Sequence, residues 1–194
     1  MRLVKTFLAA LILASPASAQ VLSESEARKS LFPTRGHVVQ VSGKLSKFDQ
    51  NIVRQIVPLM AKQLRQPVRY YATIAYSPDD GVVHDSLQAA MNFHTPQAAD
   101  RAALAACNKL KSRSANGCRV AARVVPKRYK PRPLTLSIDA TAGFNSIYRK
   151  AKSPKSFAIS RKTGNWAVGK SDGAAINSCE KIGRPGDCEI VIRD

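Results

Sequence analysis

Four cysteines fall into two copies of one local pattern, and this internal repeat constrains the fold more than any other feature. In the first copy, an alanine-rich run with apolar residues at i, i+4 and i+7 carries Cys107, and Cys118 then opens an alternating apolar run. The second copy repeats this order with Cys179 and Cys188. The first spacing predicts a helix and the alternation predicts a strand. Each copy should therefore place a helix before a strand.

The similarity extends backwards to the segments 72–83 and 156–168, ATIAYSPDDGVV and SFAISRKTGNWAV. Each predicts a strand, a glycine-closed turn and a second strand. Thr95-Pro96 and Ser171 or Asp172 are typical helix starts, and Gly183 can end the later helix. We therefore expect two related β-β-α-β halves, 71–125 and 155–194, in an α+β fold with a mainly antiparallel sheet and packed helices. The first half carries an insertion around HDSLQAAMNFH.

A further helix is expected before each half. Residues 46–66, within an N-terminal segment 20–70, form an amphipathic pattern that Pro58 should kink or split. Residues 137–150, within a basic connector 126–154, form the other candidate. A core-facing role is favoured for the first of these helices over a membrane-surface role.

The first 19 residues resemble a secretory signal peptide, since Arg2 and Lys5 precede a short apolar stretch and Ala17-Ser18-Ala19 forms a small-residue cleavage site. A membrane anchor is the alternative, but the apolar run is about half the roughly 20 residues that a spanning helix needs. We expect export to the periplasm or the exterior, with no transmembrane segment in the mature chain.

In an oxidising compartment, four cysteines predict two disulfides, and the pairing that respects the repeat is Cys107 with Cys118 and Cys179 with Cys188. A zinc site built from all four cysteines is the alternative. It is disfavoured because the sequence has no C-x-x-C pair.

The chain is strongly basic, with a formal charge of +18. From 119 to 155 there are ten Lys or Arg residues and a single acid, Asp139. Such a surface attracts anionic polymers or lipids of a cell envelope, although a merely solubilising role is the alternative. Specific nucleic-acid binding is not expected, because no recognition motif is present. The candidate anion-binding residues are Lys127, Arg128, Lys130, Arg132, Arg149, Lys150 and Lys152.

Other chemistry-bearing residues have simpler interpretations. Asp79, Asp80, His84 and Asp85 could bind a metal, but Pro-Asp-Asp-Gly is typical of a tight turn, with His84 on the strand that leaves it. The histidines His37, His84 and His94 occur in no catalytic signature. Trp166 is expected to pack in a core or hairpin rather than to serve as a ligand platform.

The motifs AYSPDDG, AADRAALAAC, GCRVAARV, AISRKTGNWAVGKSDGAAINSC and DCEIVIRD, from about residue 71 to the end, resemble the DUF4189 type of small secreted bacterial proteins. That resemblance implies a hairpin before an alanine-rich helix, and it implies no catalytic residue. Chains of this layout are sometimes labelled 5-aminolevulinate synthase, but that enzyme family holds pyridoxal phosphate in a large α/β domain. We therefore expect no cofactor and no metal.

The sequence favours an exported, non-enzymatic binding or interaction module with a basic surface. The alternative is a small hydrolase-like envelope enzyme that uses a cleft between the halves and residues such as His84 or His94. Pseudo-symmetry neither requires nor forbids a dimer, so it indicates no oligomeric state.

Overall fold

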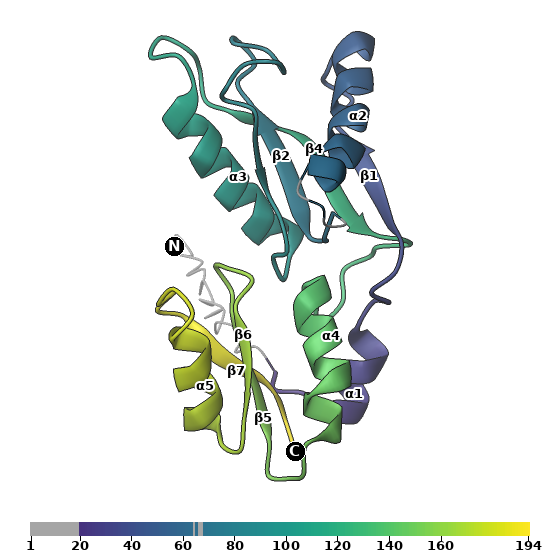
Figure 1. Ribbon diagram of the computed structural model, residues 1–194, viewed down its shortest axis with the longest axis vertical. Coiled ribbons are helices and arrows are strands. Elements are labelled where there is room, and N and C mark those ends of the chain that lie inside the picture. Colours follow the sequence, from purple (N-terminus) through teal and green to yellow (C-terminus); the bar gives the residue numbers. More distant parts are fainter. Residues whose placement is uncertain (1–19, 64, 66–67) are drawn as a thin grey trace, which may run out of the picture.

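The computed structural model describes residues 20–63, 65 and 68–194, and it has two antiparallel sheets arranged one after the other along the long axis (Figure 1). The expected signal peptide lies outside the described residues. No helix among the described residues is long and apolar enough to cross a membrane.

The first sheet has the order β1-β4-β2-β3. Its strands are β1 (His37–Val41), β2 (Ala72–Tyr76), β3 (Gln88–Ala90) and β4 (Arg119–Pro126). Helix α2 (Lys47–Gln63) packs on one face through Val53 and Val57, and α3 (Pro96–Leu110) packs on the other through Ala103 and Cys107. Pro58 lies inside α2 without splitting it.

The second sheet has the order β6-β5-β7. Its strands are β5 (Ser156–Ser160), β6 (Trp166–Gly169) and β7 (Cys188–Arg193). Helix α5 (Asp172–Glu180) covers one face. The other face is covered by α1 (Glu24–Ser30), α4 (Ile138–Ser146) and the short 3₁₀ helix η1 (Tyr148–Lys150).

The predicted repeat and α+β class are confirmed, although each half forms its own sheet. In both halves the first strand of the hairpin lies between its hairpin partner and the strand that follows the helix. Both pairings shift register at equivalent places, between Ile74 and Ala75 and between Phe157 and Ala158. The two β-β-α-β units are therefore similar in topology and in local irregularity.

One hairpin differs from its prediction. The turn closes as expected, with Gly81 N–H donating to Ser77 O at 2.9 Å. The second strand, however, begins only at Gln88, so His84 lies in the intervening turns and not on a strand. The insertion around HDSLQAAMNFH therefore lies partly within the hairpin, and it includes strand β3.

Local sequence signals account for the helix starts. Thr95 caps α3 with Pro96 at the first helical position, Ser137 caps α4 and Ser171 caps α5, each accepting a hydrogen bond from a backbone N–H three residues on. Both predicted disulfides are present with a Cα–Cα distance of 6.1 Å, and they join α3 to Cys118, directly before β4, and α5 to Cys188, the first residue of β7.

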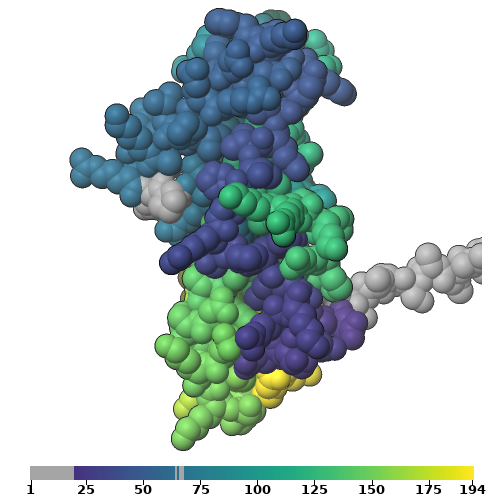
Figure 2. Space-filling model, turned by 90° about the vertical axis from the view of Figure 1, so that its right-hand side faces the viewer, coloured from purple at the N-terminus to yellow at the C-terminus, as the bar shows by residue number. Residues whose placement is uncertain are grey.

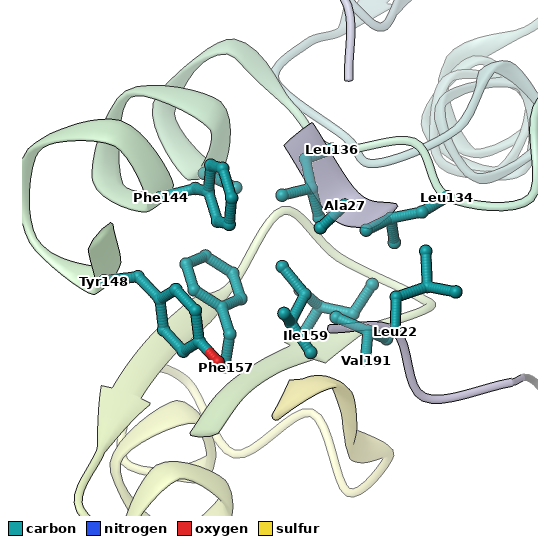
Figure 3. Packing of buried hydrophobic residues seen from close by; sticks show 11 residues of the cluster. Leu22, Ala27, Leu134, Leu136, Phe144, Tyr148, Phe157, Ile159 and Val191 are labelled. Atoms are coloured by element: carbon teal, nitrogen blue, oxygen red, sulfur yellow. The ribbon is translucent and has the colours of Figure 1, made fainter. Parts of the chain in front are cut away.

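The N-terminal segment completes the second half. Leu22 forms a parallel bridge with Ile192 on β7, and α1 packs beside α4 (Figure 1). Figure 3 shows the resulting core, in which Leu22 and Ala27 meet residues from α4, η1, β5 and β7. Phe144, Tyr148 and Phe157 pack with ring centroids 5.6 to 6.5 Å apart, and Trp166 stacks on Phe157 as its core interpretation predicts.

Candidate anion-binding surface

The predicted cationic residues separate into two groups at opposite ends of α4. Lys127, Arg128 and Lys130 lie exposed in the turn that follows β4. Lys150 and Lys152 are exposed beyond α4, next to the hairpin of the second sheet. The seven residues therefore come from two stretches of the chain, one before α4 and one after it.

Two of the seven have structural roles. Arg132 donates to the carbonyl oxygens of Ser30 and Leu31 at 2.8 and 2.9 Å, and its guanidinium lies 3.7 Å from the centroid of the Phe32 ring. Figure 2 shows the start of the connector beside the N-terminal segment. Arg149 lies 3.5 Å from Glu24. Arg132 thus joins distant parts of the chain, and both side chains are partly occupied by contacts within the chain.

The carboxylates are almost entirely used by internal contacts, whereas most cations are not. Within the described chain, every Asp and Glu except Asp85 accepts a hydrogen bond or joins an ion pair. Only six of its Lys and Arg side chains lie within 4.0 Å of a carboxylate oxygen: Arg69, Arg123, Arg149, Lys155, Arg161 and Arg193. The surface is therefore rich in cations that have no neighbouring acid to neutralise them.

A groove lies on the first half beside α3, and we call it the strand groove. Helix α3 contacts β2, β3 and β4, and beside it Val38 and Gln40 of β1 are exposed. One part of the groove has a volume of about 500 Å³ and includes Lys44, Arg119 and Tyr76. A second part of about 170 Å³ includes Gln97 and Tyr129, and both parts share Gln40 and Arg123.

The middle of the strand groove is fixed by an ion pair. Arg123 donates from Nη2 and Nε to Asp100 on α3 at 2.7 and 3.0 Å, and Thr73 Oγ1 donates to the same carboxylate at 2.6 Å. Hydrogen bonding to Asp100 raises the pKa of Arg123. Arg123 therefore positions α3 against the sheet.

Exposed cations that have no acidic partner among the described residues lie toward the two ends of the strand groove. Lys44 and Arg119 are exposed at the Tyr76 end. At the other end, Tyr129 lies in the turn that carries Lys127, Arg128 and Lys130, where its N–H donates to Pro126 O. Sequence reasoning identified this second group but missed Lys44 and Arg119, because they become neighbours only when β1 pairs with β4.

The predicted tight turn is present, and two of its acidic residues accept hydrogen bonds from the loop before β4. Asp79 accepts from Asn116 N–H at 2.6 Å, and Asp80 accepts from Ser112 N–H at 3.0 Å. The hydrogen bonds with Ser112 lower the pKa of Asp80 to about 2. These bonds attach the turn to the loop closed by the first disulfide. No cluster of three or more His, Cys, Asp or Glu residues suited to a metal occurs in the part of the chain that the structure describes.

His94 lies in the joint between the halves. Its side chain is 1% exposed, its Nδ1 accepts from Ser137 N–H at 3.1 Å, and its Nε2 lies 2.9 Å from Asn165 O. Because Nδ1 is an acceptor, the proton is on Nε2, which donates to Asn165. Both nitrogens are thus occupied, and the ring has a linking role. His84 bonds to Ser86 through Nδ1, and His37 begins β1.

Comparison with known proteins provides no relative from which a function can be transferred. No protein-family model, no curated protein and no solved structure matches the chain.

Proposed function

We propose that the protein is an exported, non-enzymatic module that binds an anionic polymer along the strand groove. The observation that carries this proposal is the unequal use of charges: nearly all the acids are bonded internally, while cations without an acidic partner lie near both ends of one groove. The two disulfides suit an oxidising, extracytoplasmic compartment.

The shape and composition of the groove support an extended ligand. The groove follows β1 and β4, and its two parts, one lined by Tyr76 and the other by Tyr129, lie one after the other along that direction. Lys44 and Arg119 would contact acidic groups near one end, and Lys127, Arg128 and Lys130 would contact them near the other. A flexible acidic glycan of several units can contact both groups at once, whereas a single small anion contacts only one. Multivalent contact of this kind raises the overall affinity.

Binding can be tested by fluorescence anisotropy with labelled oligogalacturonate, inorganic polyphosphate and neutral dextran at about 0.15 M salt, where bulk charge effects are screened beyond roughly 8 Å. We expect one anion class to bind at least tenfold more tightly than the other. The double variant K44E and R119E should weaken that binding by about tenfold or more. The matched double variant K181E and R184E makes the same charge change at exposed residues beyond α5 and should change it little.

Two results would refute the proposal. Equal weak binding of both polyanions would indicate simple attraction to a basic protein. An equal loss in the two double variants would indicate that net charge, and not the groove, determines binding.

A further inference from the structure

A second pocket lies in the other half of the molecule, between η1 and the end of β6, and we call it the lysine pocket. It has a volume of about 400 Å³. Its lining comes from two segments, the one that joins α4 to β5 and the one that ends β6: Ile147, Ala151, Lys152, Pro154, Lys155, Val168, Gly169 and Lys170. This volume lies in the range of pockets that hold small ligands.

The pocket combines apolar side chains with lysines only. Ile147 is half exposed although it is a large aliphatic residue, and Val168, Ala151 and Pro154 line the same space. Among the described residues, no carboxylate belongs to this lining. An apolar cavity with a cationic margin is complementary to a molecule that has a hydrocarbon part and an anionic end.

The three lysines differ in their availability. Lys155 is 7% exposed, and its Nζ donates to Glu24 at 2.7 Å and to Tyr148 O at 3.2 Å. It is therefore neutralised and fixed as part of the wall. Lys152 and Lys170 are exposed, and neither has a carboxylate within 4.0 Å among the described residues. They come from the two different segments that form the pocket.

We propose that the lysine pocket binds a single-chain anionic amphiphile, with its hydrocarbon chain against Ile147 and Val168 and its acidic head between Lys152 and Lys170. A carboxylate or a phosphate monoester supplies this head chemistry. The site is separate from the strand groove and does not depend on the function proposed for it.

The first test is calorimetric titration of the disulfide-bonded chain with acetate, octanoate, decanoate and dodecanoate below their critical micelle concentrations. Affinity should rise by about fourfold for each methylene that enters the apolar part of the pocket. Dodecyl phosphate should also bind, and its affinity relative to dodecanoate distinguishes the two head groups. Dodecyltrimethylammonium, which has the same chain length and opposite charge, should bind at least tenfold more weakly.

Variants then locate the site. I147D should weaken dodecanoate binding by tenfold or more, and the double variant K152E and K170E should do the same. The double variant K181E and R184E is the matched charge control. Ile147 is already half exposed, so I147D should fold, which Trp166 fluorescence can verify. Acetate binding as tightly as dodecanoate, or unchanged dodecanoate binding by I147D, would overturn the proposal.

The variants test the two proposed sites independently of each other. The K44E and R119E variant should retain dodecanoate binding, whereas I147D should retain polymer binding. Loss of dodecanoate binding in K44E and R119E but not in I147D would overturn the lysine pocket and place the amphiphile in the strand groove.

Discussion

His94 shows how one enclosed side chain makes the stability of the molecule depend on pH. The pKa of His94 is lowered from 6.5 to about 4, mainly because the ring is buried; the charge of Arg161 acts in the same direction, while the bond to Asn165 and the charge of Asp187 act in the opposite direction. The unfolded chain therefore binds a proton more readily than the folded protein. Between about pH 6.5 and pH 4 the free energy of unfolding should fall as the pH falls, by about 3 kcal/mol in total.

Urea unfolding at several pH values measures this loss, and the variant H94Q provides the control. Glutamine also has a hydrogen-bond donor and an acceptor but does not titrate. The stability of H94Q should therefore vary less with pH over this range. Asp80, whose pKa is lowered to about 2, loses its contribution to stability as the pH falls from about 3.8 to 2, which is below the pH range in which His94 acts. An equal pH dependence in H94Q and the natural protein would show that His94 is not responsible.

Single residues also show what could and could not be predicted about the site. Lys127, Arg128 and Lys130 were chosen as candidate anion-binding residues from the charge pattern, and their side chains are exposed in the turn after β4. Arg132 and Arg149 were chosen by the same reasoning, yet their partners are more than one hundred residues earlier, at Ser30, Leu31 and Glu24. A charge pattern along the chain contains no information about such distant partners.

At the scale of elements, two helical glycines provide a matched comparison. A Cβ on Gly143 of α4 would lie 2.0 Å from an atom of the Trp166 ring, whereas a Cβ on Gly173 of α5 would meet nothing within 4 Å. The variant G143A should therefore destabilise the protein by about 1 to 3 kcal/mol through overpacking. The variant G173A should be neutral or stabilising by up to about 1 kcal/mol, since alanine favours a helix.

Thermal unfolding followed by circular dichroism compares the two variants, and Trp166 fluorescence reports directly on the contact. The emission spectrum should change in G143A and not in G173A. If both variants shifted the midpoint in the same direction, the close packing of α4 on β6 would be incorrect.

The two disulfides close short loops of similar length, with sequence separations of 11 and 9. Replacing either cysteine pair by serine should cost about 2 to 3 kcal/mol, mainly because the unfolded chain gains conformational entropy. Urea unfolding of the two double variants should give similar losses. If only one of the two double variants lost stability, the two disulfides would not stabilise the two copies of the repeat equally.

The elements that could be predicted were those with strong local signals. Caps at Thr95, Ser137 and Ser171 and the alternating runs after the cysteines located three helices and two strands. Strand β3 was misplaced because Val82 and Val83 form an apolar pair directly after a turn glycine, although the pairing partner of β2 begins at Gln88. Helix α1 was missed despite a capping box of Ser23 and Glu26, which was its available sequence signal.

At the scale of the whole molecule, a network of buried and partly buried contacts joins the halves. Asp139 at the start of α4 pairs with Arg69 and accepts from Asn92 Nδ2 at 2.9 Å, and Ile138 N–H donates to Tyr70 O. A Cβ on Gly164 would lie 2.0 Å from Asn92 O, so the second hairpin approaches the first half closely. With His94, these contacts should make the halves unfold together.

Asp139 contacts both Arg69 and Asn92, so D139A should weaken the coupling between the halves. The change removes the partner of Arg69 and of Asn92, so the two halves lose bonds to each other while their own cores remain intact. Hydrogen exchange monitored by mass spectrometry should show β2 and β5 exchanging at similar rates in the natural protein. In D139A the rates should separate, and calorimetric unfolding should broaden.

The variant D85A removes the same charge where no side-chain bond is present among the described residues, so its exchange should match that of the natural protein. Equal exchange of β2 and β5 in D139A would show that other contacts, such as those of His94, suffice to keep the halves together.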